Sequence, residues 1–183
     1  MKPAPDGLSI REPLVEDAEA IAAIQVAGWQ TAFRCIASDG YLDALDSAAE
    51  AAGWRTGIAR PPSERKRIFV ADLESEIVGF VTVFPSRDKD LDPDQVGEVG
   101  AIYVSPGHWR RGVGRALMAR AIDALRSLGF NDAILWTLAA SKRSRSFYEA
   151  GGWRTDGSTN EIDLGCPVTL VRYRLSLSDS KEK

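Results

Sequence analysis

Hydrophobic positions in the first third of the chain predict one short strand followed by helices. Leu8–Arg11 has the composition of a strand, and Val15–Phe33 has a helical spacing. Four apolar side chains share one face of that helix: Ala22, Val26, Trp29 and Phe33. A second, less regular helix is expected over residues 41–57, and the Pro61-Pro62 pair then ends the region.

The middle third changes to the composition of strands. Arg67–Leu73 and Ile77–Val83 are rich in β-branched and aromatic residues, and together they predict a hairpin. Asp88–Asp94 predicts a charged, solvated loop, and Glu98–Val104 predicts a further strand.

The last third alternates helices and strands. In order, it predicts a helix, a strand, a short helix and a closing hairpin, over Gly112–Leu128, Ala133–Leu138, Ser141–Ala150 and Trp153–Leu177. The hairpin shows strict alternation, because apolar residues at 171, 173, 175 and 177 alternate with Arg172, Arg174 and Ser176. The whole order of elements implies a mixed sheet with helices on its faces.

Length and composition fit one domain. The chain has 183 residues and a net charge of −3, which argues weakly against coating nucleic acid. We expect a single domain over residues 8–177, with flexible ends at 1–7 and 178–183. No run is long enough to span a membrane, and the two cysteines have no metal-like spacing. These features predict a cytoplasmic protein that uses neither a membrane nor nucleic acid.

Residues 98–118 combine a strand, a glycine-rich basic turn and a long helix. The N-terminus of a helix is positive, and glycine lets the backbone approach an anion closely. Arg110, Arg111 and Arg115 add charge, so the segment predicts a pyrophosphate-binding turn. A P-loop is excluded by its spacing and missing lysine, and a dinucleotide-binding fingerprint by Leu117 at its last glycine position.

This turn resembles the signature Q/R-x-x-G-x-G/A of the GNAT superfamily of N-acetyltransferases. The window here is Trp109–Gly114, where both glycines match and a tryptophan stands at the first position. The resemblance implies acetyl-CoA as acyl donor, with its pyrophosphate on the turn and its pantetheine arm along the preceding strand. It implies these cofactor-binding residues: Ile102, Tyr103, Val104, Trp109, Arg110, Arg111, Gly112, Val113, Gly114, Arg115, Ala116, Ser141, Ser144 and Tyr148.

The resemblance extends from Ile10-Arg11 to the last predicted strand and implies the GNAT fold. That fold is of the α/β (α+β) class, with a mixed, mostly antiparallel central sheet of six to seven strands and about four flanking helices. It has a V-shaped splay between its fourth and fifth strands. The cofactor would lie between Glu98–Val104 and Ala133–Leu138.

A second segment resembles the family pattern N-x-x-A-x-x-F-Y-E-x-x-G-F. The chain keeps Phe147-Tyr148-Glu149 and Gly152-Trp153, whereas Ser141 replaces the usual Asn and Ser144 the usual Ala. Ser141 can still cap the helix that follows it. By resemblance, Tyr148 is the general acid that protonates the leaving thiolate, because a phenol stays protonated at neutral pH.

Glu98 is a candidate general base for the acceptor amine. It shares strand parity with Gly100, Ile102 and Val104, and Gly97 with Gly100 suggests a β-bulge beside it. A surface carboxylate at a strand end is the alternative interpretation. By resemblance, the substrate-binding candidates are Trp29 and Phe33, for which a purely structural core role stays equally open.

Other chemistry is not supported by the sequence. The aspartates of loop 88–94 lack the glycine and the final glutamate of a calcium loop, because Pro93 and Val99 occupy those positions. His108, the single histidine, lies beside the turn, so no metal site is expected. Cys35 has no visible base partner for an acyl-carrying role.

The resemblance therefore implies an acyltransferase that moves an acetyl group from acetyl-CoA to a primary amine of a small molecule or protein N-terminus. Transfer would be direct, within a ternary complex. Two alternatives stay open: a non-catalytic acyl-CoA-binding regulatory module, and the same fold with a longer acyl donor. The acceptor, a small-molecule or peptide amine, is not identified by the sequence, nor is the oligomeric state, with a homodimer among the alternatives.

Overall fold

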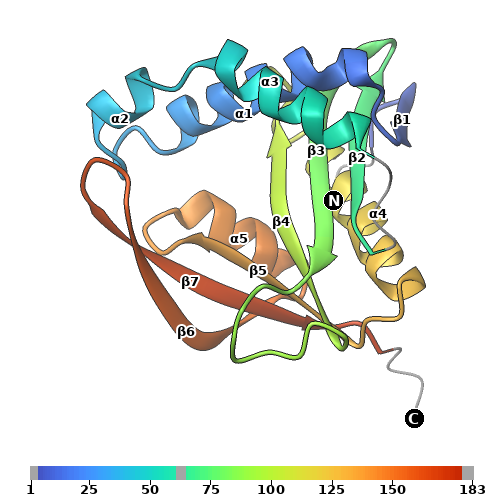
Figure 1. The fold of residues 1–183 in the computed structure, drawn as a ribbon, viewed down its shortest axis with the longest axis vertical. Helices are drawn as coiled ribbons and strands as arrows, with labels where there is room; N and C mark the ends of the chain where they lie inside the picture. Colours follow the sequence, from blue (N-terminus) through green and yellow to red (C-terminus); the bar gives the residue numbers. More distant parts are fainter. Residues whose placement is uncertain (1–3, 61–64, 179–183) are drawn as a thin grey trace.

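The computed structural model describes residues 4–60 and 65–178, which form one seven-stranded sheet flanked by helices (Figure 1). The strands are β1 (Leu8–Arg11), β2 (Arg67–Leu73), β3 (Glu76–Pro85), β4 (Val96–Val104), β5 (Asp132–Leu138), β6 (Arg154–Asp163) and β7 (Pro167–Ser176). The α-helices are α1 (Ala18–Ala32), α2 (Asp39–Asp43), α3 (Ser47–Ala59), α4 (Val113–Ser127) and α5 (Lys142–Ala150), and short 3-10 turns form η1 (Val15–Asp17) and η2 (Pro106–His108).

The sheet is mixed and mostly antiparallel, with the strand order β1-β2-β3-β4-β5-β7-β6. Only β4 and β5 pair in parallel, and they do so over three residues each, Val96–Glu98 against Asp132–Ile134. Beyond this point the two strands diverge (Figure 1). We call this divergence after Glu98 and Ile134 the fork. It is the predicted splay between the fourth and fifth strands, which confirms the fold.

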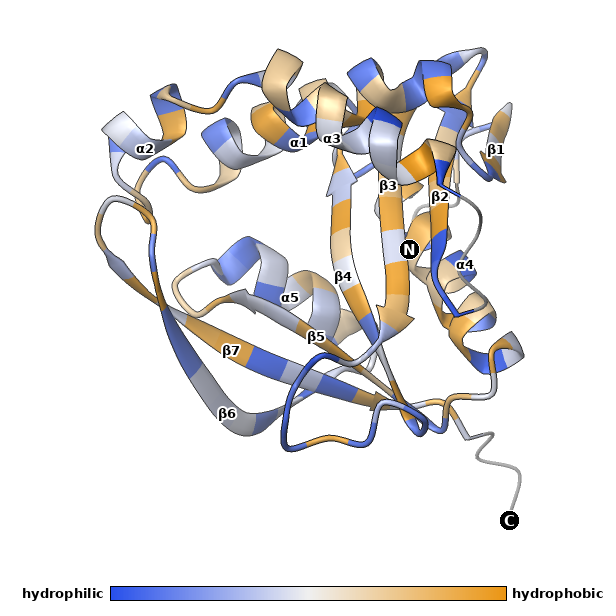
Figure 2. Cartoon of the chain, in the orientation of Figure 1, coloured by the Kyte–Doolittle hydropathy of each residue, from blue (hydrophilic) through white to orange (hydrophobic). Residues whose placement is uncertain are grey.

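Helices cover the two faces of the sheet differently. The face that we call the α4 face packs α4 and α5 on residues such as Val99, Leu135 and Tyr173. On the opposite face, which we call the α1 face, α1 packs on Val70 of β2 and Phe80 of β3. Strands β3 and β4 are largely hydrophobic, whereas β6 and the loop between β3 and β4 are hydrophilic (Figure 2). Within the described residues, no helix has the length and apolar character needed to cross a membrane.

The predicted helix over residues 41–57 is wrong in one respect, because two helices replace it. Ser38 accepts a hydrogen bond from the N–H of Tyr41 and caps α2. Asp46 accepts one from the N–H of Ala48 and caps α3. The described part of the chain therefore has five α-helices instead of about four. The Pro61-Pro62 stop lies outside the described residues, as do most of the two predicted flexible ends.

The bulge expected near Gly97 and Gly100 is present, and it overturns the expected parity of Glu98. Thr82 pairs with Ala101 and Val83 with Val99, so Gly100 is the extra residue. A Cβ on Gly100 would lie 2.2 Å from Cζ of Phe84, which explains the glycine. Because the bulge shifts the alternation by one residue, Glu98 lies on the α1 face with Ala101 and Tyr103, and Ile102 on the opposite face.

The tip of the β6–β7 hairpin bridges back to the connection between α1 and α2 (Figure 1). The backbone N–H of Ser38 donates to the carbonyl of Leu164, and the thiol of Cys166 donates to the carbonyl of Ile36. A small apolar cluster fills this contact, with Phe33 and Leu138 among its buried members. The bridge closes one end of the fork on the α1 face.

Candidate active site

The turn before α4 has an unusual backbone. Arg110 and Gly112 have left-handed φ angles of 62° and 90°. Among the described residues, no hydrogen bond uses the backbone N–H groups of the five residues 110–114. Successive N–H groups in such a turn form a concave anion site, and the positive end of α4 strengthens it. The turn therefore fits a pyrophosphate group.

Five basic side chains surround this turn: Arg110, Arg111, Arg115, Lys142 and Arg143. Within the described part of the chain none of them forms an ion pair, although Arg143 stacks over Trp109 with its Cζ 4.1 Å from the ring centroid. Unpaired arginines at the N-termini of α4 and α5 suit a ligand with several phosphates. The predicted phosphate-binding residues are thus brought together.

Trp109 has a structural role that the sequence did not reveal. Its indole N–H donates to the carbonyl of Val104 over 2.7 Å. This hydrogen bond ties the end of β4 to the turn, and the predicted contact of Val104 with the pantetheine arm stays a prediction. Ile102 lies on the stretch of β4 that has no strand partner on its β5 side, where an extended arm could pair.

Tyr103 differs from the other predicted cofactor residues, because its side chain lies on the α1 face. Its ring packs 5.5 Å from Phe80 and against Gly28 of α1. Burial is the main cause that raises the pKa of the Tyr103 hydroxyl, and the proximity of Tyr41 raises this pKa further. A hydrogen bond with Trp29 acts in the opposite direction but does not outweigh them. The ring is therefore suited to the acceptor side of the fork rather than to the cofactor.

The second motif holds α5 against α4. A Cβ added at Gly114 would lie 3.5 Å from the ring of Phe147, and Glu149 accepts a hydrogen bond of 2.6 Å from the hydroxyl of Tyr173. Ser141 caps α5 by accepting from the N–H of Ser144, and the two hydroxyls bond to each other over 2.8 Å. Both serines thus act first on the helix, and their predicted contact with the cofactor stays a prediction.

Tyr148 lies on α5 in the α4 face of the fork, with 9% of its surface exposed. Its ring is 6.0 Å from that of Tyr173. Burial, and secondarily the proximity of Tyr103, raises the pKa of Tyr148 above its ordinary value. A higher pKa keeps the phenol protonated, so it can donate but not accept a proton at neutral pH.

Glu98 lies at the base of the fork, on the opposite face from Tyr148. Its side chain is 8% exposed and accepts two hydrogen bonds of 3.3 Å from Arg87, one from the backbone N–H and one from the guanidinium. The alternative of an exposed carboxylate at a strand end is wrong. A buried carboxylate beside the fork has the position of a base, a role that no contact here tests.

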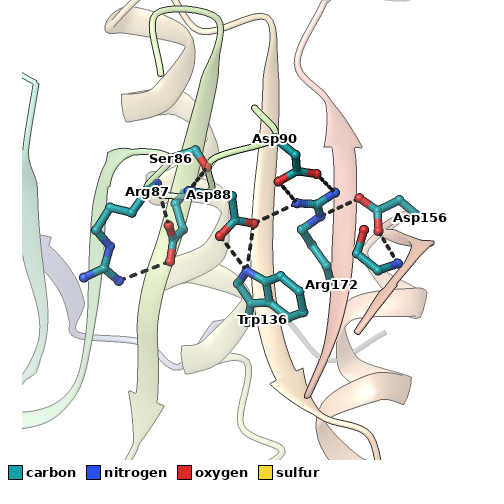
Figure 3. A network of polar contacts seen from close by, with 9 residues as sticks. Ser86, Arg87, Asp88, Asp90, Trp136, Asp156 and Arg172 are labelled. Atoms are coloured by element: carbon teal, nitrogen blue, oxygen red, sulfur yellow. Dashed lines mark hydrogen bonds and ion pairs between the residues drawn. The ribbon is translucent and has the colours of Figure 1, made fainter. Parts of the chain in front are cut away.

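The loop between β3 and β4 is largely exposed to solvent, as predicted, but a polar network that the sequence did not predict anchors its first part to β7. Arg172 of β7, only 6% exposed, pairs with Asp88 and Asp90 at 2.8 Å and with Asp156 at 2.6 Å (Figure 3). Asp88 also accepts a hydrogen bond of 3.0 Å from the indole of Trp136. Trp136 and Arg172 are direct partners across β5 and β7, and they alternate with Leu135 and Tyr173, which pack on the α4 face; the network therefore lies on the α1 face.

Sequence reasoning missed Arg172 because strand alternation placed it on a polar face. A signal did exist, since four aspartates in one short loop, at positions 88, 90, 92 and 94, favour a nearby cation. The hydrogen bond with Asp90 is the main cause that raises the pKa of Arg172. Burial raises the pKa of Asp156, but the N–H of Ser158 and the Arg172 guanidinium outweigh it and lower the pKa overall.

Trp29 and Phe33 lie together near the bridge, with ring centroids 5.1 Å apart in an edge-to-face arrangement. Phe33 is buried in the bridge cluster, whereas Trp29 is half-buried and reaches Tyr41 at 6.2 Å. Of the two predicted substrate-binding residues, Phe33 therefore packs in the core. Trp29 remains the candidate for the acceptor side of the fork.

Residues 4–60 and 65–178 contain no group of three potential metal ligands. The Nδ1 atom of His108 is buried and has no hydrogen-bond partner in that part of the chain. Cys35 and Cys166 are free thiols.

Comparison with known proteins adds the family. A family model described as Acetyltransferase (GNAT) family matches residues 29–153. The chain is 31% identical over 144 residues to the uncharacterized N-acetyltransferase YuaI of Bacillus subtilis (strain 168), covering 78% of each chain. It is 28% identical over 177 residues to the probable N-acetyltransferase Rv2775 of Mycobacterium tuberculosis, covering 93% of this chain and 95% of the other.

Solved structures show the same fold. The PaiA N-acetyltransferase of Thermoplasma acidophilum in complex with coenzyme A gives a TM-score of 0.72 at 18% identity, covering 92% of this chain and 98% of that one. The acetyltransferase YncA of Salmonella typhimurium with acetyl-CoA gives 0.70 at 19% identity, covering 96% and 97%.

Proposed function

Because the chain belongs to the acetyltransferase (GNAT) family, we propose that it transfers an acetyl group directly from acetyl-CoA to a primary amine in a ternary complex. The observation that carries the proposal is the fork between β4 and β5. A turn suited to binding an anion lies on its α4 face, Tyr148 of α5 lies on the same face, and a buried carboxylate lies on the other face.

The α4 face supports binding of the donor. Residues 110–114 offer their backbone N–H groups to the pyrophosphate, and Arg110, Arg111 and Arg115 supply positive charge. Ile102 offers its backbone to the pantetheine arm. When bound there, acetyl-CoA supplies an activated thioester carbonyl.

Two side chains handle the protons. Glu98 accepts the proton that the amine loses as its nitrogen bonds to the acetyl carbon, directly or through a water molecule. Tyr148 gives its proton to the sulfur as the carbon–sulfur bond breaks, and its buried phenol is suited to this. Both groups then exchange protons with water and return to their starting states.

The acceptor approaches from the α1 face in this proposal. That face carries Glu98 and the half-buried Trp29, and the bridge between α1–α2 and the β6–β7 tip closes its far end. A small-molecule amine or the N-terminus of a protein can enter at the open side of such a site.

The first experiment is thermal unfolding with acetyl-CoA, with ATP and NAD as controls. At a hundredfold excess over the dissociation constant, a ligand adds about 2.7 kcal/mol of stability. This is roughly 5–10 °C in melting temperature for a domain of this size. A shift with acetyl-CoA alone supports the proposal, and no shift contradicts it.

A second measurement separates an enzyme from a non-catalytic acyl-CoA-binding module. An intact turn gives the thermal shift in both cases, but only the enzyme releases a free thiol from acetyl-CoA when an amine is present. Thiol release that needs the amine, and that falls in Tyr148→Phe, supports catalysis. Binding without amine-dependent release favours the regulatory module.

A further inference from the structure

The partner of Glu98 is loosely held. Its guanidinium contact with Arg87 is 3.3 Å long, whereas charge-assisted hydrogen bonds are usually about 2.7–2.9 Å. The carboxylate is 8% exposed, but the Arg87 side chain is 73% exposed. A buried anion is thus covered by a cation that extends into solvent and can leave at little cost in packing.

A second group holds the same cation. Cζ of Arg87 lies 4.4 Å from the ring centroid of Phe84. Phe84 and Glu98 are direct partners across β3 and β4, so their side chains lie on the same face. A carboxylate next to an aromatic face is a combination that recognises organic cations.

The side chains of Glu98 and Phe84 are held in place by the fold, whereas the Arg87 side chain that they contact is free to move. The Phe84 ring lies on Gly100 at the bulge, and the strand pairing of β3 and β4 holds both side chains. The next part of the loop is anchored through Asp88 and Asp90 to the buried Arg172 (Figure 3). Movement of the exposed Arg87 side chain would therefore leave the site of Glu98 and Phe84 intact.

We propose that the Glu98 carboxylate and the Phe84 ring form the ammonium subsite for the acceptor, and that the Arg87 guanidinium occupies this subsite until the acceptor displaces it. The inference rests on the proposed function, because it places the acceptor amine beside the candidate base. It makes Arg87 an internal competitor of the substrate, and Phe84 a specificity-determining residue.

The surrounding charges narrow the chemical class of the acceptor. Once Arg87 has moved away, five carboxylates, those of Glu98, Asp88, Asp90, Asp132 and Asp156, outnumber the two guanidiniums that β7 presents on this face, those of Arg172 and Arg174. An acceptor with a carboxylate next to its amine is repelled by this surplus of negative charge. The subsite therefore fits a primary alkylammonium group without a neighbouring anion.

The test measures the equilibrium binding of three matched probes in the absence of acetyl-CoA, with NMR titration as the method. The probes are n-pentylammonium, pentan-1-ol as its uncharged counterpart, and 2-aminohexanoate, which adds a carboxylate to the same alkylamine. Wild type is compared with Arg87→Ala, Glu98→Gln and Phe84→Leu. Arg65→Ala is the matched control, because Arg65 also stacks on a phenylalanine, Phe130, and pairs with an aspartate, Asp94, away from the fork.

We expect n-pentylammonium to bind roughly tenfold more tightly to Arg87→Ala than to wild type, since the competitor is gone. Glu98→Gln and Phe84→Leu should each weaken binding by a similar factor, and Arg65→Ala should bind like wild type. Pentan-1-ol and 2-aminohexanoate should bind more weakly than n-pentylammonium to wild type and to Arg87→Ala, and the advantage of n-pentylammonium over pentan-1-ol should shrink in Glu98→Gln.

Three results would overturn the inference. Arg87→Ala binds n-pentylammonium no more tightly than wild type does, or wild type and Arg87→Ala bind pentan-1-ol as tightly as n-pentylammonium, or no form of the protein binds n-pentylammonium. The acetyl-CoA thermal shift, measured on the same samples, keeps the two proposals separate. If that shift is present while Arg87→Ala gains nothing, the ammonium subsite is wrong and the acetyltransferase proposal stands. If the shift is absent, the acetyltransferase proposal fails, whatever the amines do.

Discussion

The two faces of the fork carry opposite charge and are assembled in different ways. On the α4 face, the basic side chains belong to two short segments, 110–115 and 142–143, at the N-termini of neighbouring helices. On the α1 face, the carboxylates of Glu98, Asp88, Asp90 and Asp156 come from two strands and a loop. One buried guanidinium, that of Arg172, holds the last three of these together.

This difference suggests a division of labour. An anionic donor is recognised by backbone N–H groups and unpaired arginines, which a contiguous turn can supply. A cationic acceptor is recognised by carboxylates, which would repel each other without a cation among them. The α1 face therefore needs Arg172, and it needs a fold that brings distant segments to it.

The largest expected effect comes from removing the proposed proton donor, Tyr148, which lies on the α4 face. Tyr148→Phe should lower kcat by about 10²–10⁴-fold at saturating acetyl-CoA, because the leaving sulfur loses its acid. The acetyl-CoA thermal shift should stay as in wild type. Tyr173→Phe, which loses the hydrogen bond to Glu149, should change stability more than kcat. Full turnover in Tyr148→Phe would show that the acid lies elsewhere.

The second largest expected effect is a loss of stability when the buried cation of the α1 face, Arg172, is removed. Arg172→Gln leaves carboxylates without their cation, so the free energy of unfolding should fall by about 3 kcal/mol. Arg174→Gln, which breaks a 2.8 Å pair between the half-exposed Arg174 and Asp132, should cost no more than about 1 kcal/mol. Urea denaturation of both variants measures this. Equal losses would mean that the network has no special role.

The same network predicts a dependence on pH. The folded pKa of Asp156 and of Asp90 is lower than the unfolded value of about 3.9, so their contribution is present above about pH 4 and is lost as the pH falls below it. The difference in unfolding free energy between wild type and Arg172→Gln should therefore narrow in acid. A constant difference from about pH 6 to about pH 3 would contradict the assigned cause.

A smaller effect tests the α4 face. Replacing both Arg111 and Arg115 by glutamine should weaken acetyl-CoA binding roughly tenfold, through lost charge-assisted contacts with phosphate. The binding should also become less sensitive to salt. Arg120→Gln on the same helix, which stacks over Phe69, is the control and should bind normally. Titration calorimetry at two ionic strengths measures both the acetyl-CoA affinity and its dependence on salt. An unchanged affinity in the double variant would contradict the assigned role of the two arginines.

The smallest effect concerns the cap of α5. Ser141→Ala removes the acceptor for the N–H of Ser144 and should cost about 1 kcal/mol of unfolding free energy. If the serine acts mainly as a cap, acetyl-CoA affinity should change less than stability. A loss of affinity with unchanged stability would instead make Ser141 a direct cofactor ligand.

Much of the fold could be predicted from the sequence, because its local patterns agree with its tertiary structure. The apolar stripe of α4 and the glycine after it predicted a helix over Gly112–Leu128, which agrees within one residue at each end with the observed Val113–Ser127. The alternation of apolar and polar residues in β7 predicted a strand, which is also observed. The form of the turn before α4 was also predictable, since a left-handed glycine, arginines and a helix start are all neighbours in the chain, and its binding of an anion stays a prediction.

The α1 face could not be derived in the same way. The bulge at Gly100 was suspected, but its consequence, the move of Glu98 to the other face, depends on the pairing register with β3. The burial of Arg172 depends on a loop that lies 84 residues earlier in the chain. Alternation along one strand reports which face a side chain takes, and it contains no information about what covers that face.

The sequence by itself therefore determined most of the elements, their order and the glycine-rich basic turn before α4, because each depends on residues close together in the chain. The tertiary structure alone decided the direction of Glu98, the cation that covers it and the network that holds the loop beside it. These features arise where β3, β4, β5, β6 and β7 meet, and long-range contacts of this kind are set by strand register and packing rather than by local preference.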